Sequence, residues 1–269
     1  MIRDLISSGR LAEAGLETYS RLTRKLNRRG KCILIACMPK SGSTFLKEAL
    51  LQITGFTESI LTSAHERTEQ EMYLPRVADA YRFSTVTQQH VRATAANLQI
   101  MNRFGIRPTI LTRNIFDVVP SIRDYLLQEG FERFPSLYAT EYFAEMDEDT
   151  QFSFIISYAL PWYFQFYVSW ADAFAAGKVD ALWLTYEELS TDWAKGLGRI
   201  LEHYRIGKSE VEIASALEQT LKRDRAKLRI NKGISGRGAS MLTDRHKSMI
   251  LGMSEYYPWI DFSPIGITR

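Results

Sequence analysis

Short apolar or β-branched runs alternate along this chain with segments whose apolar residues recur at helical spacing. The runs predict buried strands over Lys31–Met38, Ser84–Gln89, Pro108–Thr112 and Val179–Thr185. The segments between them predict helices over Thr44–Ile53, Ala95–Phe104, Asp117–Gln128 and Asp192–His203. Because strands and helices alternate, we expect an α/β fold with a parallel central sheet flanked by helices. Ligands of such sheets bind beyond the carboxyl ends of the strands.

The 269 residues suit a single domain over 1–269. Residues 1–30 predict a basic amphipathic helix that docks on this domain, and a role at a membrane surface is the alternative. No run reaches the roughly 18 apolar residues of a membrane span, and the N-terminus lacks the apolar stretch of a secretory signal. The region 131–170 is rich in aromatic residues at helical spacing, and its acidic stretch Glu141–Asp149 is expected to be a mobile loop or lid.

The net charge of +3 is too small to argue for a nucleic-acid partner, although locally clustered positive groups would suit an anionic ligand. Cys32 and Cys37 lie on one apolar run, where a disulfide between them is disfavoured, and we interpret them as two small buried apolar residues. This usage favours a reducing compartment, and we expect a cytoplasmic protein. The four histidines are scattered and no HExxH motif occurs, so no metal site is expected.

A turn of small residues, Pro39–Phe45, directly follows the first predicted strand. Such a turn lets the backbone curl around an anion, and the N–H groups that open the next helix add to the attraction. Lys40 supplies a positive charge, while Ser43 and Thr44 supply hydroxyl donors. The order differs from the Walker A pattern, because Gly42 is followed by serine and the lysine precedes the glycine. A magnesium-dependent kinase or NTPase is therefore disfavoured.

A second polar group follows the strand Pro108–Thr112. Arg113 stands at the strand's end, and Ser121 lies two turns into the next helix. A guanidinium fork and a hydroxyl together can hold a phosphate dianion. Asp117 is better interpreted as a local organiser near the start of the helix, since a carboxylate would repel a phosphate. Two anion sites at neighbouring strand ends would suit one nucleotide that carries two phosphates.

Both groups resemble motifs of the sulfotransferases that use PAPS (3′-phosphoadenosine 5′-phosphosulfate). Pro39–Phe45 (PKSGSTF) resembles the family's 5′-phosphosulfate loop, PKSGTTW, and Arg113–Ser121 matches its 3′-phosphate motif, RNxxDxxxS, at every specified position. The resemblance runs from about Lys31 to Gly238 and implies the P-loop NTPase-like sulfotransferase fold of cytosolic and bacterial members. It implies PAPS as co-substrate and PAP as product, bound by Lys40, Ser41, Gly42, Ser43, Thr44, Phe45, Arg113 and Ser121.

The resemblance implies a further nucleotide contact near the C-terminus. Residues 231–236 (NKGISG) resemble the family's RKGxxG loop, except that asparagine replaces the leading arginine. Lys232 and the backbone of Gly233 are expected to contact the nucleotide, and Arg229 or Arg237 to compensate for the missing arginine.

Two aromatic residues are expected at the adenine. Phe45 stands where the family has a base-stacking tryptophan, and Tyr186 falls where the family places a tyrosine. Stacking on a base tolerates the exchange of tryptophan for phenylalanine.

Sulfuryl transfer is expected to proceed in line through a loose transition state, by analogy with phosphoryl transfer, without a metal. Lys40 would stabilise the leaving phosphate, and Ser121 would hold Lys40 away until the acceptor binds. His90 is the candidate general base, since the family's cytosolic branch ends the corresponding strand in a catalytic histidine. The run that ends at His90 lacks that branch's auxiliary lysine, and the alternative base is Glu66 or Glu69.

The aromatic region 131–170 predicts an acceptor-side helical region, and part of it would line an apolar pocket. A small lipophilic or aromatic alcohol is therefore favoured over a sugar polymer, with an amine also open. The oligomeric state is left open, and a homodimer is compatible with the sequence. The alternatives to a sulfotransferase are a P-loop nucleotide or small-molecule kinase and a PAP-binding module without catalytic activity.

Overall fold

The computed structural model describes residues 14–15, 17–19, 21–22, 30–63, 70–131, 134, 137–222 and 235–268. Within the predicted N-terminal helix, residues 14–15, 17–19 and 21–22 are helical, and the rest of 1–29 lies outside the described residues. Cys32 and Cys37 are buried free thiols, as expected from their apolar run.

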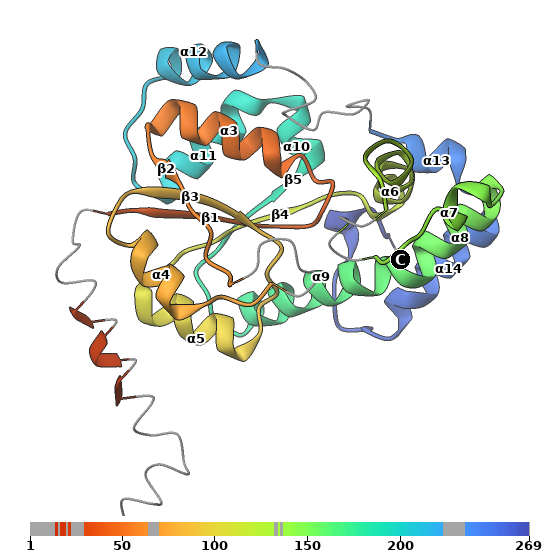
Figure 1. The fold of residues 1–269 in the computed structure, drawn as a ribbon, viewed down its shortest axis with the longest axis horizontal. Coiled ribbons are helices and arrows are strands. Elements are labelled where there is room, and N and C mark those ends of the chain that lie inside the picture. Colours follow the sequence, from red (N-terminus) through yellow and green to blue (C-terminus); the bar gives the residue numbers. More distant parts are fainter. Residues whose placement is uncertain are drawn as a thin grey trace, which may run out of the picture.

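A five-stranded parallel sheet forms the centre of the fold, in the order β2-β3-β1-β4-β5 (Figure 1). The strands are β1 (Cys32–Cys37), β2 (Thr57–Glu58), β3 (Thr85–Gln89), β4 (Thr109–Thr112) and β5 (Leu182–Thr185). The predicted α/β fold with a parallel sheet is thus confirmed. The sequence pattern missed β2, a two-residue exposed edge strand that has no apolar alternation to reveal it.

Helices cover both faces of the sheet, because alternate residues of β1 face opposite cores. Ile33 and Ile35 pack with α3 (Ser43–Thr54), α10 (Tyr186–Thr191), α11 (Trp193–His203) and α12 (Glu210–Leu221). Leu34 and Ala36 face the larger core on the other side, which includes α4 (Leu74–Ala80), α5 (Ala95–Phe104) and α6 (Ile115–Glu129). The predicted helices over 44–53, 95–104, 117–128 and 192–203 agree with α3, α5, α6 and α11 to within two residues at each end.

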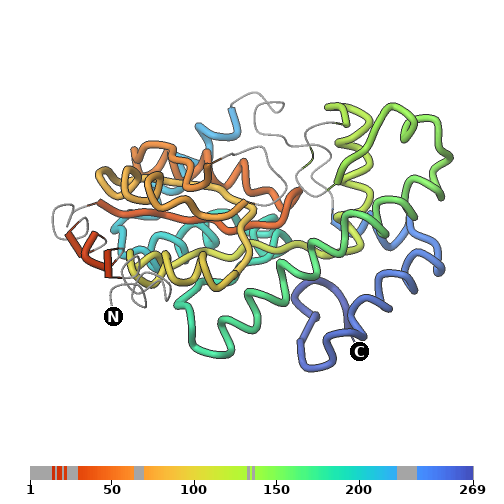
Figure 2. The backbone as a smooth tube through the Cα atoms, turned by 60° about the horizontal axis from the view of Figure 1, so that its bottom comes forward, coloured from red at the N-terminus to blue at the C-terminus, as the bar shows by residue number. Residues whose placement is uncertain are grey.

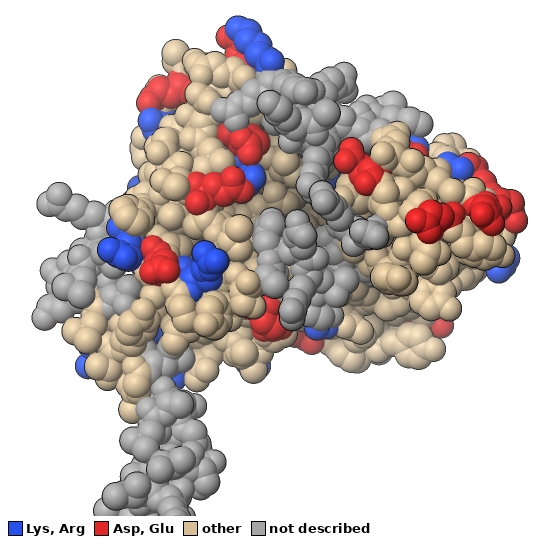
Figure 3. Space-filling view, viewed as in Figure 1, with Lys and Arg blue, Asp and Glu red and all other residues tan. Residues whose placement is uncertain are grey.

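The aromatic region folds as α7 (Tyr142–Glu145), α8 (Glu148–Tyr158) and α9 (Leu160–Ala175). Pro161 lies in the first turn of α9, where its missing N–H leaves no helical bond unmade. The prediction of a loop over Glu141–Asp149 is wrong, because α7 and the start of α8 lie within this stretch. Asp147 caps α8, and the acidic side chains in the first turn of α8 interact favourably with the helix dipole. Acidic side chains gather on the surface at the end of the molecule that carries α7 and α8 (Figure 3).

α9 extends from the sheet to the helices at the far end, where it packs with α8 and α14 (Asp244–Glu255) (Figure 2). The remaining short helices of the described residues are α13 (Arg237–Met241) and a 3-10 turn at Ser263–Ile265. α9 is buried along most of its length, since its aromatic side chains contribute to the larger core.

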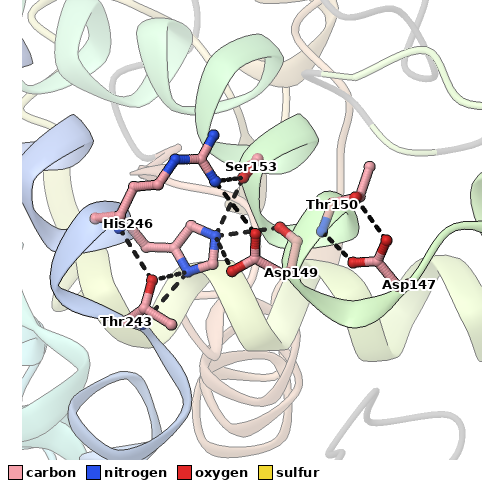
Figure 4. Close-up of polar contacts among 7 residues, drawn as sticks. Asp147, Asp149, Thr150, Ser153, Thr243 and His246 are labelled. Carbon is pink, nitrogen blue, oxygen red and sulfur yellow. Dashed lines mark hydrogen bonds and ion pairs between the residues drawn. The ribbon is translucent and has the colours of Figure 1, made fainter.

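His246 joins α14 to α8 through a polar cluster with Ser153 and Asp149 (Figure 4). The backbone N–H of Thr243 donates to His246 Nδ1 at 3.3 Å, so the ring proton is on Nε2. Nε2 then donates to the Asp149 carbonyl at 3.1 Å and cannot accept a proton from Ser153. The cluster combines the residue types of a hydrolase triad but has the wrong tautomer for one, and it serves to dock the two helices.

Candidate functional site

The two anion motifs meet at one edge of the sheet. β1 and β4 are neighbouring parallel strands, and the backbone N–H of Met38 donates to the carbonyl of Leu111 at 3.0 Å just where both strands end. The chain after β1 therefore turns beside the chain after β4. Arg113 Nη1 donates to the carbonyl oxygen of Lys40 at 2.7 Å, which joins the two motifs directly.

Four consecutive carbonyl groups at the end of β1 each accept a hydrogen bond from a side chain. The pairs are Cys37 with His90 Nδ1 (2.9 Å), Met38 with Ser41 Oγ (2.7 Å), Pro39 with Tyr163 Oη (3.1 Å) and Lys40 with Arg113 Nη1 (2.7 Å). Three of these donors come from distant parts of the chain. Each of these carbonyls therefore has its hydrogen bond satisfied by the protein itself, without a contribution from a ligand.

The backbone of the turn favours an anion. Lys40 and Gly42 have positive φ angles of 64° and 79°, and such left-handed residues turn successive N–H groups toward one side. α3 begins at Ser43 with no side-chain cap, so its first N–H groups are available to a ligand. A side chain at position 42 would not fit, because a Cβ there would lie 2.9 Å from Cδ2 of Tyr186.

The hydroxyl groups of the turn have different environments. Ser41 is fully buried and uses its hydroxyl proton on Met38, so its contribution to a ligand is limited to its backbone N–H. Ser43 Oγ accepts a hydrogen bond from Gln88 Nε2 at 2.9 Å, and the hydroxyl also interacts with the Cys37 thiol. Thr44 is half-buried in the first turn of α3.

The aromatic residue of the turn is not an exposed platform. Phe45 is 3% exposed and packs edge-on against Trp193, with ring centroids 4.5 Å apart. Trp193, at the start of α11, is half-buried and lies beside the turn, since a Cβ on Gly42 would be 3.7 Å from Cη2 of its ring. Trp193 and Tyr186 thus flank Gly42.

Arg113 is 7% exposed and has several neighbours. Its guanidinium lies 4.4 Å from the ring centroid of Tyr186, and Nη1 is 3.4 Å from Ser121 Oγ. Its Nε is buried and has no hydrogen-bond partner among the described residues. One helical turn beyond Ser121, Lys40 Nζ lies 4.5 Å from the ring centroid of Tyr125. Arg113 is thus a buried cation with an unused N–H donor, which suits it to bind an anionic ligand.

One carboxylate stands beside this cationic group. Glu187 Oε1 accepts the backbone N–H of Asn114 at 3.1 Å. Burial raises the pKa of the Glu187 carboxyl, while hydrogen bonds and the charge of Arg113 oppose the shift. An anion bound at Arg113 would therefore lie near a carboxyl whose charged form burial already disfavours.

Asp117 has a structural role in the described residues. Its two carboxylate oxygens accept the backbone N–H groups of Gly236 and Gly238, at 2.6 and 2.7 Å. The approach is close, because a Cβ on Gly238 would collide with the backbone of Phe116. Asp117 thus fastens the C-terminal segment to the first turn of α6, which agrees with its interpretation as an organiser.

Most of the predicted C-terminal nucleotide loop lies outside the described residues. Asn231, Lys232, Gly233 and the possible substitute Arg229 lie outside the described residues. Arg237, the other possible substitute, forms a largely buried ion pair with Asp124 on α6, at 2.7 Å. Its guanidinium is therefore already engaged in holding α13 against α6.

His90 directly follows β3 beside the turn and is half-buried. A carbonyl oxygen can only accept, so Nδ1 of His90 carries a proton and donates to the carbonyl of Cys37 at 2.9 Å. The backbone N–H of His90 donates to Gln70 Oε1 at 2.6 Å, and the Trp162 ring lies edge-on at 6.5 Å. The alternative bases, Glu66 and Glu69, lie outside the described residues, as does His65.

Known proteins resemble this chain in fold and not in sequence. No family model matches the sequence, and no curated protein matches it. A mouse sulfotransferase, SULT7A1, complexed with PAP superimposes with a TM-score of 0.59 at 19% identity, over 86% of each chain. Retinol dehydratase with androsterone and the inactive cofactor PAP gives a TM-score of 0.55 at 12% identity, over 88% of this chain and 82% of that one.

The chain has the sulfotransferase fold. A second retinol dehydratase structure, in a complex with retinol and PAP, gives a TM-score of 0.52 at 14% identity, over 83% of this chain and 81% of that one. Among the described residues of this sulfotransferase fold, no helix is long and apolar enough to cross a membrane. In the same ranges, no three or more His, Cys, Asp or Glu side chains form a group that could hold a metal ion.

Two residues of the site escaped the sequence analysis. Tyr163 was one of many aromatic residues in the region 131–170, and its contact with Pro39 spans 124 positions. Trp193 stood at the start of a predicted helix, where nothing in the pattern linked it to Phe45. The only available signal was the replacement of tryptophan by Phe45 in the turn, which left room for a larger ring from elsewhere.

Proposed function

We propose that this protein is a PAPS-dependent sulfotransferase, which transfers a sulfuryl group to a hydroxyl or amine of a small acceptor. The observation that supports this most directly is the hydrogen bond from Arg113 to the Lys40 carbonyl. It brings two cationic groups to one edge of a sheet, as a nucleotide with phosphates at both its 3′ and 5′ positions would require. The sulfotransferase fold and the PAP complexes of similar structures add to the argument.

In this proposal the turn after β1 binds the 5′ end of the donor. The backbone N–H groups of residues 41–45, the Ser43 hydroxyl and Lys40 would contact its phosphosulfate. Arg113 and Ser121 would hold the 3′-phosphate, with the unused Nε of Arg113 as one donor. Tyr186 and Trp193 would flank the adenine, and Phe45 would pack against the ring of Trp193. Lys232 and Gly233 would contribute the remaining nucleotide contacts predicted from the sequence.

The chemistry is a single in-line displacement at sulfur. A bond forms from the acceptor oxygen or nitrogen to sulfur, and the bond from sulfur to the bridging phosphate oxygen breaks. Lys40 and the N-terminus of α3 stabilise the negative charge that develops on that oxygen, so PAP leaves as the anion. With Nδ1 donating to the Cys37 carbonyl, Nε2 of His90 is the nitrogen that accepts the proton of the acceptor. The proposal assigns no step to a metal ion.

The acceptor is proposed to be a small lipophilic or aromatic alcohol. The ring of Trp162 stands beside His90 and stacks on Phe166 at 5.3 Å, which gives an aromatic wall next to the proposed base. Flat apolar molecules bind such walls well. Retinol and androsterone occur in the similar retinol dehydratase structures, and both are lipophilic. A cytoplasmic location and a homodimeric state remain predictions from the sequence.

The test is transfer of label from [³⁵S]PAPS to a panel of phenols, sterols, sugars, amines and peptides. Sulfation of at least one lipophilic alcohol is expected, with activity retained in excess EDTA. Parallel reactions with [γ-³²P]ATP and magnesium serve as the control for a kinase. Transfer from ATP but not from PAPS would overturn the proposal, as would PAP affinity no higher than AMP affinity.

A further inference from the structure

One helix contacts both chain segments that carry the proposed catalytic residues. On the β3 side, Nε1 of Trp170 donates to the carbonyl of Val91 at 3.0 Å, and the N–H of Ala93 donates to Ser169 Oγ at 3.1 Å. Both contacts lie within three residues of His90. α9 therefore fixes the segment that follows the proposed base.

On the β1 side, α9 holds the turn through Tyr163. This side chain is fully buried, and its hydroxyl donates to the carbonyl of Pro39 at 3.1 Å. Proline has no N–H, so this carbonyl is the residue's sole polar backbone group. Pro39 directly precedes Lys40, and the direction of its carbonyl sets the orientation of the peptide plane that leads into Lys40.

We propose that Tyr163 is a positioning residue for sulfuryl transfer, a role that rests on the proposed function. Its hydroxyl holds the Pro39 carbonyl away from the anion site, so the N–H groups of the turn and the Lys40 ammonium face the 5′ end of the donor. Because the same helix holds the chain after His90, α9 sets the separation between the leaving group and the base. Without the hydroxyl, a buried carbonyl loses its partner and the turn gains alternative conformations.

The molecule supplies a matched control on the same helix. Tyr167 is also buried, at 4% exposure, and its hydroxyl also donates to a backbone carbonyl, that of Asp261, at 2.7 Å. Burial raises the pKa of the Tyr167 phenol, which keeps it a neutral donor. Tyr163→Phe and Tyr167→Phe thus remove the same atom from similar surroundings, and only the first contacts the turn.

The experiment measures calorimetric affinities of both variants and the wild type for PAP and for 3′-AMP, which lacks the 5′-phosphate. Tyr163→Phe is expected to weaken PAP binding about three- to tenfold and to leave 3′-AMP binding within about twofold, as expected for one lost ordering contact. Tyr167→Phe should leave both affinities unchanged. Melting temperatures should fall by similar amounts in the two variants, and kcat at saturating PAPS should fall in Tyr163→Phe alone.

The outcomes separate the inference from the proposed function. If wild type binds PAP tightly and Tyr163→Phe binds it equally well, the positioning role is wrong and the sulfotransferase proposal stands. Equal losses for PAP and 3′-AMP would also overturn the role, because they would mark a general structural effect. If the wild type binds PAP no better than 3′-AMP, the proposed function itself fails.

Discussion

Arg113 donates a hydrogen bond to the carbonyl of Lys40 over a distance of 2.7 Å and a sequence separation of 73 residues. The guanidinium thereby shapes the turn that carries the proposed catalytic lysine, in addition to facing the proposed 3′-phosphate. Substitution of Arg113 should consequently impair both ends of the nucleotide site, whereas substitution of its neighbour Ser121 should impair one end.

Ser121→Ala is expected to reduce PAP affinity about three- to tenfold and to leave AMP affinity unchanged, since it removes one hydrogen bond to the 3′-phosphate. Arg113→Lys should weaken the binding of both PAP and AMP. A lysine ammonium lacks the guanidinium fork and cannot donate to the phosphate and to the Lys40 carbonyl together. Calorimetry with PAP and AMP measures the effects. Ser215→Ala, on the exposed side of α12, is the control. Equal losses of PAP and AMP affinity in Ser121→Ala would place the 3′-phosphate elsewhere.

His90→Asn tests the general base while sparing the turn. An asparagine amide can still donate to the Cys37 carbonyl, as Nδ1 of His90 does, but it provides no basic nitrogen. We expect kcat to fall by about 10²- to 10⁴-fold, the usual contribution of a general base, with PAP affinity within about twofold of wild type. Radiolabel transfer and calorimetry measure the two quantities. Full activity would shift the role of base to Glu66 or Glu69.

Trp193→Ala should weaken PAP binding by about tenfold or more, because stacking of one base on an aromatic side chain contributes about 1–3 kcal/mol. The half-buried ring should also report binding, and quenching of its fluorescence by PAP is expected to disappear in the variant. Trp259→Phe changes a tryptophan that is 64% exposed and is the control for unrelated fluorescence. Wild-type PAP affinity in Trp193→Ala would leave the adenine to Tyr186 alone.

Glu187→Gln should show a specific pH dependence. Burial raises the pKa of Glu187 from its ordinary value of 4.5, so the folded protein binds this proton more readily than the unfolded chain. The stability of wild type relative to the variant should therefore fall as pH rises from about 4.5 through the raised pKa, and stay constant above it. Urea unfolding across pH 4 to 8 measures this difference.

Glu202→Gln is the control for Glu187→Gln, because Glu202 is an exposed glutamate of α11. At pH 7, Glu187→Gln should also bind PAP more tightly than wild type, because a negative charge near Arg113 is removed. A stability difference that does not vary with pH would show that Glu187 titrates alike in the folded and unfolded states.

The sequence predicted the features that depend on local pattern. Strand β1 is short and apolar throughout, a pattern that indicates a strand buried on both faces, and the structure shows this burial. Its carboxyl end lies beside that of β4, so the two predicted anion motifs lie at neighbouring strand ends. The contacts that order the turn could not be predicted, since Tyr163 and Trp193 reach it from other elements and only packing brings them there. The burial of Phe45 depends likewise on Trp193, whose ring packs against it at a centroid distance of 4.5 Å.

The four engaged carbonyls at the end of β1 have a consequence for protein engineering. A transplant of Pro39–Phe45 into another parallel sheet would carry the sequence motif but only one of the four donors, the hydroxyl of Ser41. The grafted loop would relax into other shapes. Restoring the binding of a sulfated nucleotide would require the transplant to include the ends of β3 and β4 and helix α9 as well.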